Sequence, residues 1–110
     1  MRVVTNGVVK QMNDELKQKA KDGNAEAQCI LGWTLAYQGK EEKALYWMRK
    51  AADQGHAEAQ YEFGIRYQYG RGFTQNDKEA IKWYKKAADQ GLAIAKYDLD
   101  VMYEQGRGER

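Results

Sequence analysis

Apolar and small residues recur at spacings of three and four along most of the chain, and charged residues occupy the positions between them. This period is typical of amphipathic helices, and glycines interrupt it at intervals, as they do after helix C-termini. The pattern predicts six helices separated by turns. They are expected at residues 8–22, 24–38, 41–53, 56–69, from 76 or 77 to about 90, and at 92–104, after a frayed lead-in at 1–7.

Two stretches of this pattern recur. The segment ALYWMRKAADQG ends at Gly55, and a close copy ends 36 residues later at Gly91. The segment GNAEAQCILG begins at Gly23 and returns as GHAEAQYEFG from Gly55 and GLAIAKYDLD from Gly91. A period between about 20 and 50 residues indicates a solenoid of stacked units. We therefore predict one all-α domain over 1–110, with a capping helix at 8–22, repeats at 23–54 and 55–90, and a half repeat at 91–110.

The first repeat is four residues shorter than the second. The difference falls in the loop between the paired helices, where QGKEEKA replaces YGRGFTQNDKEA. Loops tolerate deletions because they run over the surface. This loop is therefore expected to carry little packing.

The second repeat has small, aromatic and glycine residues at fixed positions. These are Ala57, Glu58, Ala59, Gln60, Phe63, Gly64, Tyr67, Gly70, Gly72, Ala80, Trp83, Tyr84, Ala87, Ala88 and Gly91. The pattern resembles the Sel-one-like repeat (SLR), a relative of the tetratricopeptide repeat, over roughly residues 20–108. The resemblance implies an α/α solenoid, a right-handed stack of antiparallel helix hairpins, that serves as an adaptor or scaffold and does not catalyse a reaction. In the third copy Lys96 and Asp100 replace the glutamine and the glycine, which predicts that no helix packs on the last helix there.

Residues shared by the repeats are interpreted as packing residues, and Trp47 and Trp83 are expected to fill the seam between repeats. Partner-binding residues are sought instead at positions that differ between repeats but share one helix face. Residues four apart on the first helix of each pair give three such columns. The columns are Cys29, Tyr61 and Tyr97; Trp33, Ile65 and Val101; and Tyr37, Tyr69 and Gln105. The first helices line the concave side of tetratricopeptide-like stacks, so these columns are predicted to form an aromatic-rich groove that binds a protein or peptide.

The groove hypothesis has an alternative at each position. The column residues could simply pack against the preceding partner helix. Glu62 and Arg66, one step round the same helix, are predicted to form a polar rim, or else an ordinary surface pair. The predicted partner-binding set is Trp33, Tyr37, Tyr61, Ile65, Tyr69, Tyr97, Val101, Glu62 and Arg66.

Net charge and the counts of cysteine and histidine bear on nucleic-acid binding, metal binding and catalysis. The net charge is +2 and basic residues stand beside acidic ones, so little non-specific attraction to nucleic acid is expected. Cys29 is the only cysteine and His56 the only histidine, which leaves no histidine metal cluster and no intramolecular disulfide. We expect no metal, cofactor or catalytic residue, and no enzyme. No run approaches membrane-spanning length, and a reducing cytoplasm is the expected compartment unless a signal peptide has been removed.

Three functions are considered. An interaction scaffold for another protein or peptide ranks first. A nucleic-acid-binding helical repeat ranks second, with Arg71, Lys82, Lys85, Lys86 and Arg107 as its basic residues. A hydrolase ranks third, because some cysteine-rich SLR relatives are credited with β-lactam binding or hydrolysis, but this chain lacks their paired cysteines.

A separate hypothesis concerns assembly. The last helix is expected to expose part of Leu99, Met102 and Tyr103. That surface would be covered by end-to-end self-association of two chains, by a partner, or by further repeats of a longer array.

Overall fold

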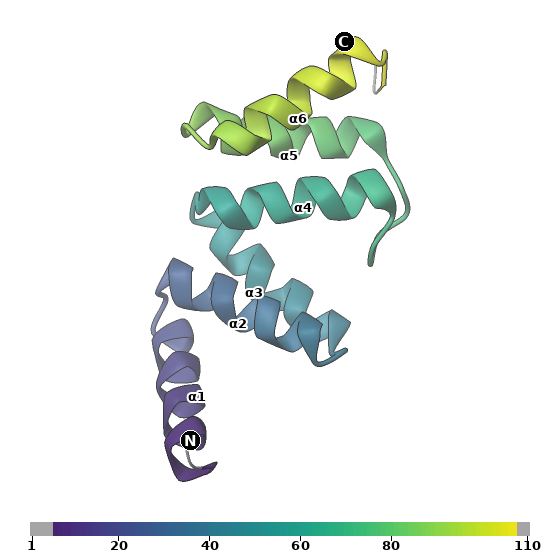
Figure 1. Ribbon diagram of the computed structural model, residues 1–110. Helices are drawn as coiled ribbons and strands as arrows, with labels where there is room; N and C mark the ends of the chain where they lie inside the picture. The colour runs from purple at the N-terminus through teal and green to yellow at the C-terminus, as the bar shows by residue number, and fades with distance from the viewer. Residues whose placement is uncertain (1–5, 108–110) are drawn as a thin grey trace, which may run out of the picture.

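The computed structural model describes residues 6–107, which form six helices joined by short loops (Figure 1). The helices are α1 (Asn6–Lys21), α2 (Ala25–Tyr37), α3 (Glu41–Asp53), α4 (Ala57–Tyr69), α5 (Asp77–Asp89) and α6 (Ala93–Glu104). All six predicted helices are confirmed, each within two residues of its expected bounds. The predicted lead-in is shorter than expected because α1 already begins at Asn6, and residues 1–5 lie outside the described part. None of the described helices is long and apolar enough to cross a membrane.

The helices pack as a row of antiparallel hairpins. The pairs α2 with α3 and α4 with α5 make the most extensive contacts, α1 packs on α2, and α6 packs on α5. The contact between α3 and α4 joins the two hairpins, and the described chain measures 51 × 29 × 24 Å. Figure 1 shows α2, α4 and α6 toward the viewer, with α3 and α5 behind them. The predicted α/α solenoid is therefore confirmed.

Each hairpin closes at a glycine that lets two helices approach. A Cβ atom added to Gly32 would lie 2.5 Å from Met48 Cγ, and one added to Gly64 would lie 2.4 Å from Tyr84 Cδ1. In α6 the equivalent residue is Asp100, which is exposed and whose Oδ2 pairs with Lys96 Nζ at 3.1 Å. Within residues 6–107 no helix packs on that position, as the sequence predicts.

Glutamines of the repeated motif join the two helices of each hairpin, and Gln28 and Gln60 also donate to a carbonyl of the preceding helix. Gln28 Nε2 donates to the Ala20 carbonyl at 3.0 Å, and Gln54 Nε2 donates to Gln28 Oε1 at 2.8 Å. The second repeat has the same pair, since Gln90 Nε2 donates to Gln60 Oε1 at 2.8 Å. Both motif glutamines are buried, and their side-chain amides are satisfied, so the motif is a packing device.

The loop between α4 and α5 contributes to the core, which corrects the expectation that it carries little packing. Phe73 in this loop stacks on Tyr67, with 4.3 Å between ring centroids, and on Phe63 at 5.6 Å. Phe63 in turn contacts the buried Trp83 at 5.2 Å, so Trp83 fills the seam as predicted, while Trp47 in the first repeat is only half-buried. The longer loop thus completes an aromatic cluster.

Replacing Phe73 by alanine is expected to lower the free energy of unfolding by about 2 kcal/mol. Truncating a fully buried phenylalanine costs about 3–5 kcal/mol, and Phe73 is half-buried. Urea denaturation followed by circular dichroism measures the loss. The neighbouring Thr74 is exposed, and Thr74→Ala is expected to change stability by less than about 0.5 kcal/mol. Equal effects of the two substitutions would show that the loop does not support the core.

The C-terminal helix buries the residues that were expected to lie open. Leu99 and Met102 are buried in one cluster with Ala80, Ile81 and Tyr84 of α5. The expectation of an exposed apolar end is therefore wrong for these two residues, while Tyr103 is half-buried against the same cluster. A second chain that stacked on α6 as α5 stacks on α4 would also meet Asp100 in place of a glycine. Because Leu99 and Met102 are buried, they no longer support the hypothesis of end-to-end self-association.

Candidate partner-binding face

The residues predicted to bind a partner lie on α2, α4 and α6, on the surface that we call the first-helix face. It comprises Trp33, Tyr37, Tyr61, Ile65, Tyr69, Tyr97 and Val101. Four of these are exposed aromatic residues: Tyr37 exposes 94% of its surface, Tyr97 67%, Tyr69 63% and Trp33 42%. Tyr61, Ile65 and Val101 are half-buried. The structure thus places all seven on the helices expected, but only Tyr37, Tyr69 and Tyr97 present most of their surface to solvent, and Trp33 presents slightly less than half.

Exposure along the first column rises from one hairpin to the next. Cys29 is 0% exposed, which corrects its placement in an open groove, whereas Tyr61 is half-buried and Tyr97 is mostly exposed. The Tyr61 hydroxyl donates to Asp98 Oδ2 of α6 at 2.7 Å. Burial and this carboxylate raise the pKa of Tyr61. Tyr61 therefore joins α4 to α6 and is a structural residue as well as a surface one.

A shallow depression of about 210 Å³ lies between α4 and α6 on the first-helix face. Its apolar wall is made by Tyr69, Tyr97 and Val101. Its polar groups belong to Gln68, Asp98, Gln105 and Arg107. Aromatic side chains beside hydrogen-bonding groups are typical of protein-binding surfaces, because they bury area while specifying orientation.

Arg66 does not form an exposed rim, and its prediction as a rim residue is wrong. It is 6% exposed, and its guanidinium binds Glu41 at the start of α3 as well as Glu62 Oε2, which lies 3.2 Å from Arg66 Nε. Glu62 itself is half-buried. The pair four residues apart is thus part of a three-residue ion cluster that ties α4 to α3.

The sequence pattern did not indicate Glu41 and Arg107 as ion-pair partners. Asp77 occupies the position of Glu41 in the second repeat, and its Oδ1 lies 3.0 Å from Arg107 Nη2 after α6. The acidic residue at the start of the second helix of each hairpin thus pairs with an arginine of the repeat or half repeat that follows. The signal in the sequence was the acidic residue that opens both second helices, which also suits the helix dipole.

Burial shifts the pKa values of Glu62 and Arg66 in this ion cluster. Burial raises the pKa of Glu62, although a hydrogen bond from Trp33 and the charge of Arg71 oppose the rise. Burial and the neighbouring Arg71 lower the pKa of Arg66. The cationic partners of Glu62 stabilise its charged carboxylate, and removing them would leave a partly buried charge unpaired, which would lower the stability of the fold.

Comparison with known proteins agrees with this architecture. The family model for the Sel1 repeat matches residues 25–56 and 57–92, which is more than half of the chain. The chain belongs to the Sel1 repeat family. A comparison with curated proteins gives no match.

Two of the solved structures that are similar to this chain are Sel1 repeat proteins. One is the crystal structure of c5321, described as a protective antigen of uropathogenic Escherichia coli strains with an SLR fold, at 44% identity and a TM-score of 0.81. The match covers 87% of this chain and 21% of that protein, so the chain spans about a fifth of its length. The other is a Sel1 repeat protein from Oxalobacter formigenes, at 33% identity and a TM-score of 0.83, covering 90% of this chain and 77% of that one.

Cys29 and His56 are the single cysteine and the single histidine of this Sel1 repeat protein. Burial and nearby glutamates raise the pKa of Cys29 to about 12, so its thiol stays protonated at neutral pH. His56 precedes α4, and its Nδ1 lies 3.5 Å from Glu58 Oε1. Within residues 6–107 no group of three or more His, Cys, Asp or Glu side chains is arranged to hold a metal ion.

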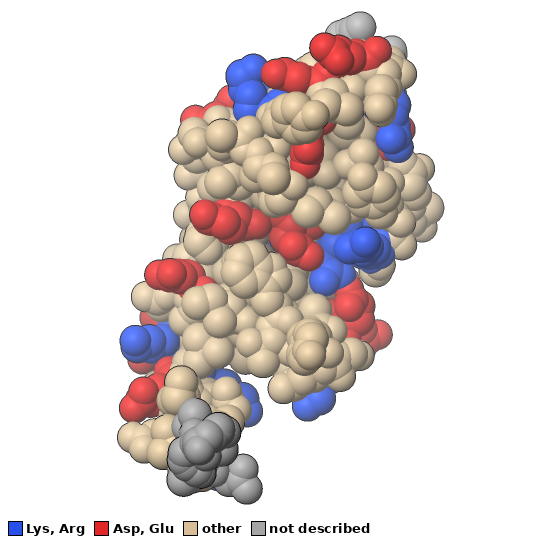
Figure 2. Space-filling view, in the orientation of Figure 1, with Lys and Arg blue, Asp and Glu red and all other residues tan. Residues whose placement is uncertain are grey.

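Charge is mixed over the visible surface of the Sel1 repeats. Figure 2 shows acidic and basic side chains interspersed, and at the level of α4 acidic groups lie beside basic ones. Such alternation weakens long-range attraction for a polyanion, because opposite charges within a Debye length cancel.

Proposed function

We propose that this Sel1 repeat protein is a non-catalytic interaction scaffold that binds a partner protein or peptide through the first-helix face. The observation that carries the proposal is the row of four exposed aromatic residues, Trp33, Tyr37, Tyr69 and Tyr97, on successive first helices. Exposed tyrosine and tryptophan give large rigid contact areas, and such residues dominate binding energy at interfaces. The depression beside Tyr69 and Tyr97 supplies the polar groups that would fix the register of a partner.

The structure also shows which substitutions can test this proposal without damaging the fold. Tyr61 bonds to Asp98, so a charge at Tyr61 would disturb the packing of α6. Tyr69 of α4 and Tyr97 of α6 are exposed, and both line the depression. The double variant Tyr69→Ser, Tyr97→Ser therefore removes the aromatic surface and keeps the helices.

We expect this double variant to lose at least about tenfold in affinity for a partner captured by the native protein. The partner is identified by capture from the source cell, then purified, and its Kd is measured by calorimetry for each protein. Met12→Ser is the control, since Met12 is 59% exposed on α1 and lies off this face. Equal affinities of the double variant and the native protein, at equal helicity, would move the binding site elsewhere.

A further inference from the structure

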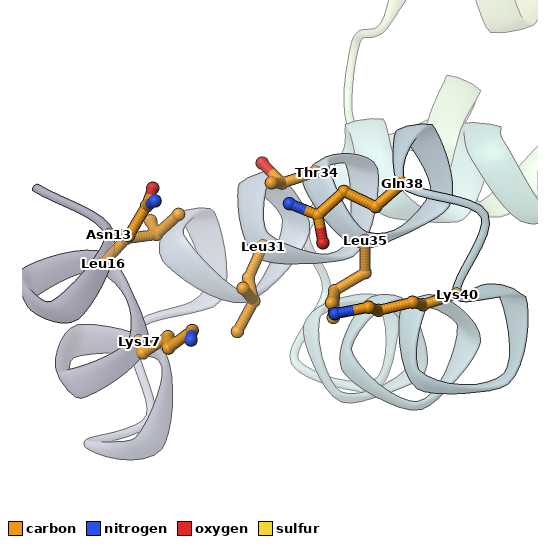
Figure 3. A pocket seen from close by; sticks show the side chains of 8 residues that line it. All are labelled: Asn13, Leu16, Lys17, Leu31, Thr34, Leu35, Gln38 and Lys40. Carbon is orange, nitrogen blue, oxygen red and sulfur yellow. The ribbon is translucent and has the colours of Figure 1, made fainter. Parts of the chain in front are cut away.

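A second candidate site lies between the capping helix and the first hairpin, on a different surface. Figure 3 shows side chains of α1, α2 and the start of α3 around an open hollow, with Lys17 and Lys40 extending toward Leu31 and Leu35. The hollow has a volume of about 170 Å³. A neighbouring depression of about 380 Å³ shares Lys17, Leu31, Leu35 and Lys40 and continues to Tyr46 and Trp47. We call the two together the first-repeat hollow.

The second repeat fills the same space with its own side chains. Leu31 lies eight residues after Gly23, and Phe63 lies eight residues after Gly55, so these two positions are equivalent. Four residues further on, Leu35 is equivalent to Tyr67. In the second repeat both rings stack on Phe73. The first repeat has no counterpart of Phe73, because its loop is four residues shorter. The first-repeat hollow is therefore the place of a missing aromatic ring.

The size of the smaller of the two depressions fits this explanation. An engineered apolar cavity of about 150 Å³ admits benzene, so about 170 Å³ admits the ring of a phenylalanine side chain. Other walls of the hollow are also smaller or more polar than in the second repeat. Asn13 stands where α3 has Leu45, and Thr34 stands where α4 has Arg66.

The rim of the hollow is positively charged. Lys17, Lys21, Lys40 and Lys43 surround the apolar floor, and all four are exposed. Among residues 6–107 none of these four forms an ion pair. Four unpaired cations around an aromatic-sized hollow complement a segment that carries an aromatic ring between acidic residues.

We propose that the first-repeat hollow binds a short peptide segment of a partner protein, in which a phenylalanine or similar ring is flanked by aspartate or glutamate. The ring takes the place that Phe73 has in the second repeat, against Leu31 and Leu35. The flanking carboxylates pair with Lys17 and Lys40 and with the two lysines beyond them. This site is separate from the first-helix face and does not depend on the function proposed for it.

The probe for a binding experiment is the fluorescein-labelled peptide Ser-Gly-Asp-Glu-Phe-Glu-Asp-Gly-Ser, titrated with the full chain by fluorescence anisotropy. The expected Kd is on the order of 0.1 mM, as one anchoring ring with a few screened ion pairs allows. A peptide with alanine for phenylalanine is expected to bind at least about tenfold more weakly. A peptide with Asn and Gln for the acids is expected to bind weakly and without salt dependence. Equal binding of the Phe and Ala peptides, or no binding up to about 1 mM, would overturn the proposal.

Two protein variants test the location. Lys17→Glu with Lys40→Glu is expected to reduce affinity at least about tenfold, whereas Lys82→Glu with Lys85→Glu, the same change of net charge on α5, is expected to leave it unchanged. Equal losses in both would show non-specific charge attraction and overturn the site. The Tyr69→Ser, Tyr97→Ser variant should bind the probe normally, so failure of one proposal is distinguishable from failure of the other.

A loop graft gives a second, independent test. Replacing Gln38 and Gly39 by residues 70–75, Gly-Arg-Gly-Phe-Thr-Gln, restores the length of the second repeat and supplies a ring to fill the hollow. The grafted protein is expected to lose probe binding at least about tenfold. The same graft with serine for phenylalanine is its control and should still bind, because the hollow stays open. Probe binding that survives the phenylalanine graft, at native helicity, would contradict the assignment.

Discussion

Replacing Arg66 by methionine is expected to lower the free energy of unfolding by about 3 kcal/mol. Arg66 is buried and joins Glu41 of α3 to Glu62 of α4, so the substitution leaves two carboxylates without their cation. Breaking a buried ion pair by removing one partner costs about 3–5 kcal/mol. The lower end applies because Glu41 is half-exposed and can turn toward water. The loss is measured by the shift of the urea midpoint at constant m-value.

A triple variant separates the charge effect from the loss of packing. In Arg66→Met, Glu41→Gln, Glu62→Gln the uncompensated charges are gone while the apolar side chain remains at position 66. Because a neutral cluster needs no cation, this variant is expected to recover at least half of the lost stability. If the single and triple variants are equally unstable, burial of unpaired charge is not the cause.

The Arg66→Met variant is also expected to respond to pH in a defined direction. Burial already raises the pKa of Glu62 in the folded protein above its value in the unfolded chain. A raised carboxyl pKa contributes stability at low pH, and this contribution is lost as the pH rises through the folded value. Without Arg66 the pKa of Glu62 rises further. The stability gap between variant and native protein should therefore narrow as the pH falls from neutral toward the range in which glutamates titrate, and Glu62→Gln should abolish the narrowing.

Arg66 illustrates what the sequence could and could not predict. The three-to-four spacing and the recurring glycines predict every helix within two residues, because local periodicity depends only on neighbours along the chain. The spacing of Glu62 and Arg66 likewise indicates a pair. The third member, Glu41, comes from the preceding hairpin, and it turns a predicted surface pair into a buried cluster. A contact between residues so far apart in the chain leaves no periodic signal.

Burial on the first-helix face was hard to predict for a related reason. Cys29, Tyr61 and Tyr97 occupy the same position in three repeats, yet their exposure runs from none to most of the side chain. The repeat pattern fixes which way each residue points. Exposure depends on whether the next hairpin covers it, as Asp98 of α6 covers Tyr61.

The first-repeat hollow shows a third limit. The sequence revealed that four residues are missing from the first loop, and this was interpreted as ordinary loop variation. Only the packing of Phe73 on Phe63 and Tyr67 shows that the longer loop has a core side chain. The first repeat lacks this side chain, and the first-repeat hollow is the space that the missing ring leaves open.

Gly64→Ala is the second substitution with a large expected effect, a loss of about 2–3 kcal/mol. The added Cβ would lie 2.4 Å from Tyr84 Cδ1 and 2.5 Å from Cε1. The Tyr84 ring is buried and its hydroxyl donates to Gln68 Oε1 at 2.6 Å, so it cannot turn away without losing both its packing and this bond. Alanine gains about 1 kcal/mol of helix propensity over glycine, and the loss from overpacking must exceed this gain.

The first repeat contains the matched comparison. Gly32 closes the first hairpin in the same way, but the shortest contact of an alanine there is with Met48 Cγ at 2.5 Å, in an unbranched and adaptable side chain, while the Ala44 carbonyl oxygen lies 3.1 Å away. Gly32→Ala is therefore expected to cost at least about 1 kcal/mol less than Gly64→Ala, measured by urea denaturation. Tyr84→Met should relieve part of the Gly64→Ala loss, since the double variant copies the first repeat's pairing of small residue and methionine. The two alanine variants could instead lose equal stability, with no recovery in Tyr84→Met. That result would show that close contact between the two helix backbones, and not the rigid tyrosine ring, causes the loss of stability.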